Sequence, residues 1–381
     1  MLVKTTTNKR IKYKSNPKKD EFIKVLRKRV WNYFEENNIS KHANGEMYFK
    51  TALAIVSWIG LYALIMSNAL SHSYLLTIGA FCLLGFVNIF MAFNIVHDAC
   101  HGAYSANKKV NKYMGLFMNF IGGNAYLFTR MHNAHHAFVN IHGSDVTLET
   151  HGLFRFTPDE PWQPKHKWQH IYTPIVYCLA SLHWTAVKDF KWFFMEEHIG
   201  NNKNMKHPTS ELIMLLVTKF IYFGLHIALP LLFLTVPWWV VLLGYLMLHI
   251  PSSLMFALVF QVTHVYDGTT YPIPDNEGNI ENNYALHVLE TTADFSRKNP
   301  VANWFFGGIN IHVIHHIMPG ICHVHYPALT KILEETVEEF GIEYQENDSF
   351  LGAFIKHIEM LKILSKPNAE VPRVGKSAEF V

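Results

Sequence analysis

Long apolar stretches alternate with polar segments along this chain. Four apolar stretches cover about residues 51–69, 74–96, 212–236 and 238–262. Each is close to the ~20 residues that a helix needs to cross the hydrocarbon of a bilayer. The links between the first and second stretches and between the third and fourth are very short, which favours tight turns. The pattern therefore predicts an all-α membrane protein with four transmembrane helices in two hairpins.

The remaining segments are too polar to cross a bilayer. A basic amphipathic helix is predicted over Glu21–Glu36, with Phe22, Leu26 and Val30 on its apolar side. Such a helix either lies in the membrane interface or packs on the rest of the protein. The Lys-rich residues 1–20 are expected to be disordered. Three regions follow: a basic N-terminal segment (1–45), a membrane domain (46–345), and a C-terminal helix with a tail (346–381).

Composition supports a membrane protein with substantial water-facing parts. Half of the residues are hydrophobic, and 17% are charged, against about 25% in an ordinary soluble domain. The net charge of +3 is too small to suggest a nucleic acid partner. The four cysteines lack paired spacing, so a disulfide framework is not expected.

Histidines form three clusters, here called boxes. Box one is the pair His97 and His101, box two is His132, His135 and His136, and box three is His312, His315 and His316. Residues three and four apart share one face of a helix, so each box can point all its imidazoles one way. Random placement of 24 histidines in 381 residues would give the His-x-x-His-His pattern only about 0.1 times, yet it occurs twice.

Charge also predicts an orientation in the membrane. The two turns, at 71–73 and 235–237, carry no Lys or Arg, whereas the N-terminal, central and C-terminal regions hold the basic residues. The positive-inside rule places these three regions in the cytoplasm. Both termini and a helical cap carrying all three boxes would then lie on the cytoplasmic side. Counting the apolar pieces 114–128 and 171–187 as further spans would separate box two from box one, so they are expected to be interfacial or buried.

Eight imidazoles are too many for one structural zinc, which takes four ligands. They suit two metal ions with about four ligands each and with coordination positions left for dioxygen. Imidazole binds iron, copper and zinc, so ligand type alone does not choose the metal. Asp98, the carboxylate inside box one, is expected to accept a hydrogen bond from an imidazole and fix its tautomer.

The sequences HDACH, HNAHH and HVIHH, with apolar hairpins before and between them, resemble the membrane fatty acid desaturase family. The resemblance implies a di-iron centre that uses dioxygen and two electrons to desaturate an acyl chain, supplied as acyl-CoA or membrane lipid. It assigns metal ligation to the eight box histidines and points to His264, after the fourth stretch, as a ninth ligand. It also suggests that Asp145 supports a ligand, although an aspartate that caps a loop is an equal alternative.

Residues around box three are similar to the front-end and linoleoyl-CoA desaturase branch: Gly307 to Asn310, Pro319, and Cys322 to Pro327. That branch typically has Gln where this chain has His312, so the position of the new double bond stays open. His323 and His325 are expected to cap the next helix or to support the ligands. No His-Pro-Gly-Gly motif marks a fused haem domain. A separate ferredoxin or small cytochrome is therefore the expected electron donor.

Two other functions are compatible with histidine boxes. A lipid hydroxylase on the same scaffold would add a hydroxyl group in place of a double bond. A membrane metal transporter would need ionisable residues along a path through the membrane. The four apolar stretches hold few, mainly Lys219, His226 and His249, which disfavours the transporter.

Overall fold

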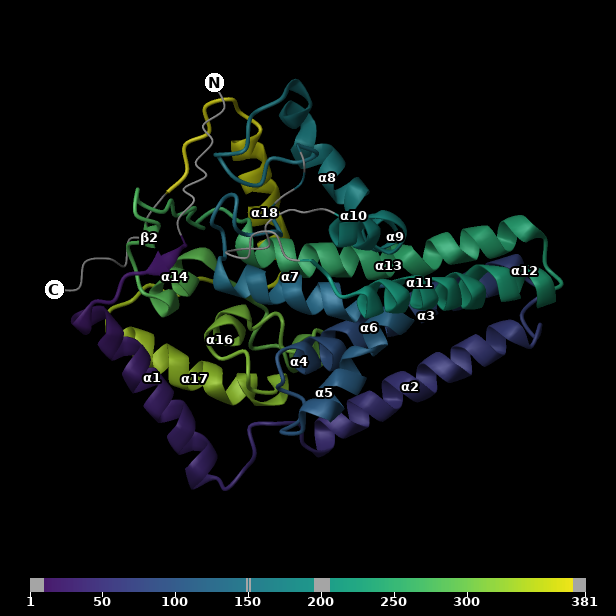
Figure 1. Ribbon diagram of the computed structural model, residues 1–381, viewed down its shortest axis with the longest axis horizontal. Coiled ribbons are helices and arrows are strands. Elements are labelled where there is room, and N and C mark those ends of the chain that lie inside the picture. The colour runs from purple at the N-terminus through teal and green to yellow at the C-terminus, as the bar shows by residue number, and fades with distance from the viewer. Residues whose placement is uncertain (1–9, 149, 151, 195–205, 373–381) are drawn as a thin grey trace.

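The computed structural model of the protein describes residues 10–148, 150, 152–194 and 206–372 (Figure 1). These residues are mostly helical, as the sequence predicts. The strands are two short parallel pairs. β1 (Lys12–Tyr13) pairs with β2 (Asn279–Ile280), and β3 (Asp294–Phe295) pairs with β4 (Glu346–Asn347). Each pair joins segments that are far apart in the sequence.

Four helical segments of the described residues are long and apolar enough to cross a membrane. They cover Gly45–Met66, Tyr74–Cys100, Thr209–Phe233 and Trp238–His264. The first and third begin and end a few residues earlier than predicted, and the second and fourth continue further into the histidine-bearing region. Figure 1 shows these helices running together toward one side of the molecule, with the remaining helices gathered around their other ends.

The first and fourth segments are the single helices α2 (Gly45–Met66) and α13 (Trp238–His264). The second consists of α3 (Tyr74–Met91), a π-helical turn and α4 (His97–Cys100). The third consists of α11 (Thr209–Phe223), a π-helical turn and α12 (Leu229–Phe233).

The inner pair of these segments is α3 and α13, which make the most extensive helix contact in the protein. A Cβ atom at Gly85 would lie 2.1 Å from the carbonyl oxygen of Leu248, so only glycine allows the helices to approach this closely. The outer segments carry exposed apolar side chains, including Val56 at 68% and Phe220 at 81% exposure. Such a surface suits contact with lipid, because apolar side chains cover a helical backbone whose own hydrogen bonds are complete.

The other helices are shorter and lie mainly beside the ends of α3 and α13 where histidines gather (Figure 1). They are α1 (Pro17–Glu36), α5 (Lys108–Gly115), α6 (Phe117–Phe120), α7 (Ala125–Ala137), α8 (Gln169–Tyr177), α9 (Ala180–His183), α10 (Asp189–Phe194), α14 (Tyr284–Thr291), α15 (Pro300–Phe305), α16 (His312–Ile317), α17 (Tyr326–Glu339) and α18 (Phe350–Leu364). The predicted last helix is present, with the Ser349 side chain accepting a hydrogen bond from the Gly352 amide.

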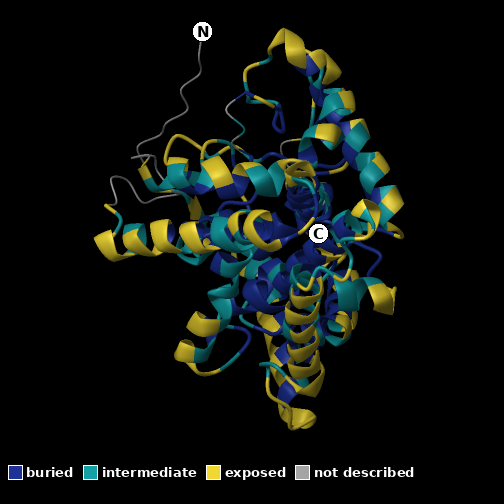
Figure 2. Cartoon of the chain, turned by 90° about the vertical axis from the view of Figure 1, so that its right-hand side faces the viewer, coloured by how far each residue is buried: buried dark blue, intermediate teal, exposed yellow. Residues whose placement is uncertain are grey.

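The N-terminal amphipathic helix packs on the protein. Phe22, Leu26 and Val30 of α1 are fully buried in one core with Leu329 and Leu333 of α17. Of the two sequence interpretations, packing is therefore the one observed. The expectation of disorder over 1–20 is wrong for the described residues from Arg10 onward, because β1 pairs with β2 and α1 already begins at Pro17. Figure 2 shows the buried residues concentrated in the middle of the molecule and the exposed ones on the outer faces of its helices.

Candidate metal centre

The three boxes sit on three helices that meet in the interior. Box one follows a π-helical turn, Ala92–Val96, after which His97 opens α4 (His97–Cys100) and His101 is the C-cap residue that follows it. Turns of this kind interrupt α-helices frequently at functional sites. Box two lies on α7, whose first turn is capped by the Asn124 side chain accepting from the Leu127 amide at 2.9 Å. Box three lies on α16. The helical spacing predicted for boxes two and three is confirmed.

All eight box histidines and His264 form one cluster. His264 is the last residue of α13, and its Nε2 lies 3.1 Å from that of His135 and 2.9 Å from that of His312. The Nε2 atoms of His97 and His132 are 3.0 Å apart. Eight of the nine side chains are buried, and His101 is partly buried. Ring nitrogens this close to one another can bind the same metal ion.

The ring nitrogens fall into groups that could each hold a metal ion. One group is His97, His101, His132 and His315, and another is His135, His264, His312 and His316. His136 approaches His315 and His316 and so lies between the two. An imidazole nitrogen sits about 2.0–2.1 Å from a metal such as zinc. Two ligands at right angles would then lie about 3 Å apart, which matches the observed Nε2 separations.

Two further nitrogens point to a missing ligand partner. Nε2 of His101 and Nε2 of His315 are buried and have no hydrogen-bond partner among the described residues. Leaving a buried polar atom unsatisfied costs about 1–3 kcal/mol. Coordination to a metal would satisfy both atoms, so the residues fit the metal that the box pattern predicts.

The outward-facing nitrogens of several rings are held by acceptors. Nδ1–H of His264 donates to the Thr291 carbonyl at 3.1 Å, and Nδ1–H of His312 donates to the Ile309 carbonyl at 2.8 Å. A carbonyl can only accept, so these rings carry their proton on Nδ1. The Nε2 lone pair is then free for a metal, which is the usual arrangement behind a histidine ligand.

Burial keeps the imidazoles neutral. It lowers the pKa of His101, His132, His136, His312, His315 and His316, and neighbouring imidazoles lower each of them further. A neutral ring is the form that binds a metal. The cluster therefore presents ligands in the correct protonation state at neutral pH.

Asp145 stands directly behind His135. Its oxygens accept from His135 Nδ1–H at 3.0 and 3.1 Å, from the Asn140 amide at 3.0 Å, and from the amide and hydroxyl of Thr147 at 2.9 and 2.7 Å. Burial by itself would raise the pKa of this carboxyl, but His135 and Thr147 outweigh it and the pKa is lowered. The sequence left open whether Asp145 supports a ligand or caps a loop, and its hydrogen bonds to His135 and to the backbone amides of Asn140 and Thr147 are compatible with both roles.

Asp98 has an imidazole partner that lies outside the boxes. Its Oδ2 accepts from His323 Nδ1–H at 2.9 Å, and the Lys50 ammonium donates to His323 Nε2 at 2.8 Å. The helix-capping role expected for His323 and His325 is wrong, because neither side chain caps α17, and His325 instead contacts the His42 carbonyl. The reason is tertiary: Asp98 lies 225 residues away from His323 in sequence.

Asp98 and His323 also approach Cys322, in a group that could by composition hold a metal. Lys50 argues against a cation there, because its ammonium occupies the second nitrogen of His323 and would repel the ion. Lys50, His323 and Asp98 instead form a hydrogen-bonded link between box one and the segment after box three. Sequence inspection missed Lys50, although a lysine next to the first apolar stretch was a signal.

The loop before box three presses against box one. Gly307 adopts φ +58°, and a Cβ atom there would lie 2.6 Å from the Phe93 carbonyl oxygen in the π-helical turn. Only glycine can adopt this left-handed backbone conformation without steric cost, and any side chain here would also clash with Phe93. The Gly307-Gly308 pair seen in the sequence therefore brings boxes one and three together.

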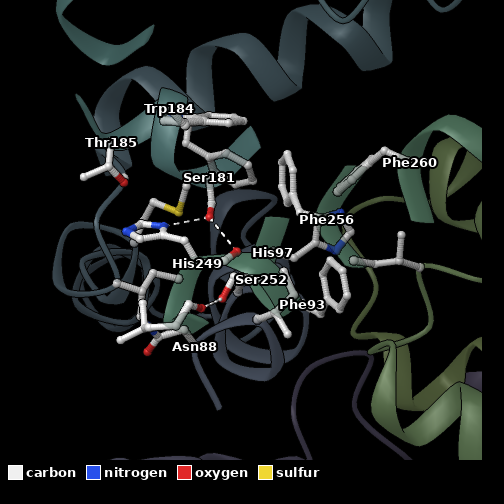
Figure 3. A pocket seen from close by; sticks show the side chains of 18 residues that line it. Asn88, Phe93, His97, Ser181, Trp184, Thr185, His249, Ser252, Phe256 and Phe260 are labelled. Carbon is white, nitrogen blue, oxygen red and sulfur yellow. Dashed lines mark hydrogen bonds between the residues drawn. The ribbon is translucent and has the colours of Figure 1, made fainter. Parts of the chain in front are cut away.

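A mostly apolar pocket adjoins the cluster at His97 (Figure 3). Side chains from α3 and α13 form much of its wall. Phe93, Phe256 and Phe260 gather around His97, whereas Asn88, Thr185 and His249 lie toward the other end (Figure 3). An elongated apolar space beside the candidate metal centre is suited to a hydrocarbon chain.

The helical architecture, the four apolar segments and the buried histidine cluster define a membrane protein with a site able to hold metal ions. Residues 71–347 match the family model described as "Fatty acid desaturase". The chain belongs to the fatty acid desaturase family.

Three relatives illustrate the match. The sn-1 linoleoyl-lipid 6-desaturase of Synechocystis is 31% identical over 94% of this chain and 99% of its own length. The acyl-lipid (8-3)-desaturase of Physcomitrium patens is 29% identical over 90% of this chain and 71% of its own. The probable Delta(5) fatty acid desaturase C of Dictyostelium discoideum is 29% identical over 90% of this chain and 76% of its own. These relatives support the front-end branch and a fatty acyl desaturase, an oxidoreductase.

Proposed function

We propose that this chain is a di-iron, front-end desaturase of lipid-bound acyl chains, with His97, His101, His132, His135, His136, His264, His312, His315 and His316 as its metal ligands. The convergence of their Nε2 atoms, 2.9–3.1 Å apart in the closest contacts, carries the proposal. When bound, the two iron ions would supply the activation of dioxygen. Imidazole is a suitable ligand for iron, and the fatty acid desaturase family generally uses iron.

The reaction removes one hydrogen from each of two neighbouring carbons. The chain R–CH2–CH2–R′, dioxygen, two electrons and two protons give R–CH=CH–R′ and two waters. A ferredoxin or small cytochrome would deliver the electrons. The protein's own contribution is to hold the hydrocarbon in the pocket beside His97, where Phe93, Phe256 and Phe260 exclude water and position the reacting carbons.

The names of the relatives support a proposal for the substrate class. The Synechocystis protein is named for a linoleoyl-lipid substrate, and the other two are named for acyl-lipid or fatty acid desaturation. We infer that this chain likewise acts on an acyl chain that already contains a double bond. His312, which stands where Gln is typical of the branch, approaches His264 and is proposed to be a ligand like its neighbours.

A fatty acid profile tests the function. The chain is produced in a host with a compatible reductase and supplied with saturated and polyunsaturated acids, and products are located by gas chromatography with mass spectrometry. We expect a new double bond between an existing one and the carboxyl end. A bond in a saturated chain would assign another branch, and a hydroxylated product would favour a lipid hydroxylase.

We also propose that the four apolar segments form two hairpins, with the histidine-bearing cap and both termini in the cytoplasm. In this arrangement residues 46–345 form the membrane desaturase domain, between the N-terminal segment and the C-terminal helix with its tail. The absence of Lys and Arg from the turns at 71–73 and 235–237 supports this orientation.

Cysteine labelling tests the orientation. His72 and Lys109 are both exposed, and they lie in a turn and in the cap respectively. In a variant whose four native cysteines are replaced by serine, a membrane-impermeant maleimide should label His72→Cys in intact cells. It should label Lys109→Cys only after permeabilisation, and the reverse pattern would refute the cytoplasmic cap.

A further inference from the structure

Asn88 presents an unused hydrogen-bond donor at the pocket. It lies on α3, is 3% exposed and contributes to the pocket wall. The Trp58 indole donates from Nε1 to Asn88 Oδ1 at 3.1 Å. An indole N–H can only donate, so the atom that it meets must be the amide oxygen. Trp58 thereby fixes the orientation of the amide, and its NH2 group is the free end.

Three other polar side chains that line the pocket, Ser181, His249 and Ser252, already have partners. Ser181 Oγ contacts His249 Nδ1 at 2.8 Å, and His249 Nε2 contacts the Tyr222 hydroxyl at 3.1 Å. Ser252 Oγ donates to the Gly85 carbonyl at 2.8 Å. By contrast, Asn88 Nδ2 is buried and finds no partner within the described part of the chain. An unsatisfied buried donor in a cavity calls for an acceptor from outside the protein.

Position limits which acceptor can reach it. Asn88 and His97 are nine residues apart on one continuous helical segment, or about 13 Å at ~1.5 Å per residue. Asn88 lies near the middle of that segment, Tyr74–Cys100, and so within the proposed hydrocarbon layer. The polar head of a lipid stays at the bilayer surface, because burying its ester without a partner is unfavourable. In the rest of an acyl chain, the only acceptors are the π-electrons of existing double bonds.

We propose that Asn88 determines substrate specificity by donating from Nδ2 to an existing double bond, on the methyl side of the carbons that are oxidised. This inference rests on the proposed desaturase function. It explains why a polar amide is kept in an apolar pocket and why a second helix holds it in one orientation. His249 at the same end is already bonded to Ser181 and Tyr222, and Asn88 supplies the recognition (Figure 3).

A competition assay tests the proposal. Wild type is given equal linoleoyl and oleoyl substrates in one sample, so that differences in protein level cancel in the product ratio. The expected result is preferred conversion of linoleoyl. Asn88→Leu should lower the linoleoyl-to-oleoyl ratio about two- to fivefold, the factor that a weak N–H···π hydrogen bond supplies.

Two companion variants separate recognition from folding. Asn88→Leu leaves the Trp58 indole N–H without its acceptor. The double variant Asn88→Leu with Trp58→Phe removes both hydrogen-bonding partners, so that two apolar side chains face each other. It should show the same lowered ratio. Thr77→Val is the matched control, because its hydroxyl is buried on the same helix but contacts the backbone carbonyls of Leu70 and Ser73 and does not line the pocket, and its ratio should equal that of wild type.

The outcomes are distinct. If wild type converts both substrates and the ratio is unchanged in both Asn88 variants, the donor serves only water or no ligand, and the proposal is overturned. If Thr77→Val lowers the ratio equally, a general disturbance of α3 is the cause and the assignment to Asn88 also fails. If wild type converts neither substrate with iron and a donor present, the proposed function itself fails.

Discussion

His315→Ala should abolish desaturation and lower the iron content of the purified protein. His315 belongs to two of the candidate metal-binding groups, one with the box-one histidines and His132, the other with His136 and His316. Its side chain is fully buried. Its Nε2 lacks a partner among the described residues, while its Nδ1 contacts the Tyr326 hydroxyl at 3.2 Å. Replacing even an outer partner of a metal ligand costs about 10–100-fold in affinity or activity. Removing the ligand should therefore cost more than about 100-fold in product formation.

The measurement combines the fatty acid profile with the iron content per chain, determined by plasma emission spectroscopy. His72→Ala is the matched control, because His72 is an exposed histidine in the turn between α2 and α3, far in the chain from the boxes. It should retain iron and activity. Full activity of His315→Ala would remove this residue from the proposed ligand set. Equal accumulation of both variants in membranes would exclude misfolding as the cause of the loss.

Asp145→Asn should weaken iron binding about 10–100-fold while leaving the fold intact. The carboxylate is fully buried and accepts hydrogen bonds from the His135 ring, the Asn140 backbone amide and Thr147. Asparagine has the same shape, but its amide NH2 would face one of these donors. The negative charge that orients His135 and strengthens it as a ligand would also be lost.

An iron titration of the metal-free protein measures this effect directly. Activity of Asp145→Asn should recover partly as the iron supply rises, since the nine histidines remain. Asp348→Asn changes an exposed carboxylate and serves as the control, with unchanged iron affinity expected. If Asp145→Asn binds iron as tightly as wild type, the carboxylate acts only as a loop cap. That was the alternative which the sequence left open.

Lys50, His323 and Asp98 form a second hydrogen-bonded group next to the histidine cluster, at box one. The chain of contacts runs from α2 through the segment after box three to α4, which carries His97 and Asp98. Lys50 and Asp98 are buried, so each depends on its partner for solvation. Residues outside the three boxes, Lys50 and His323, thus help to hold box one next to the segment that follows box three.

Local pattern alone determined the helices and the histidine faces. Box two and box three are read correctly because i, i+3 and i+4 positions share a helix face wherever the helix lies. The four apolar segments are found for the same reason, since a span is recognised from consecutive residues. Their ends differ from prediction by a few residues where caps and π-helical turns, such as Ala92–Val96, continue or shift the helix.

Partnerships across the chain were decided only by the tertiary structure. The division of nine histidines into groups depends on how α4, α7, α13 and α16 meet, and no local spacing encodes it. Asp98 was expected to support an imidazole, but its partner, His323, could not be identified from sequence. Likewise, the polar Asn88 in an apolar stretch gains meaning only when Trp58 of another helix fixes its amide. The physical reason is that hydrogen bonds and metal ligation depend on distances between side chains, which folding sets and sequence separation does not.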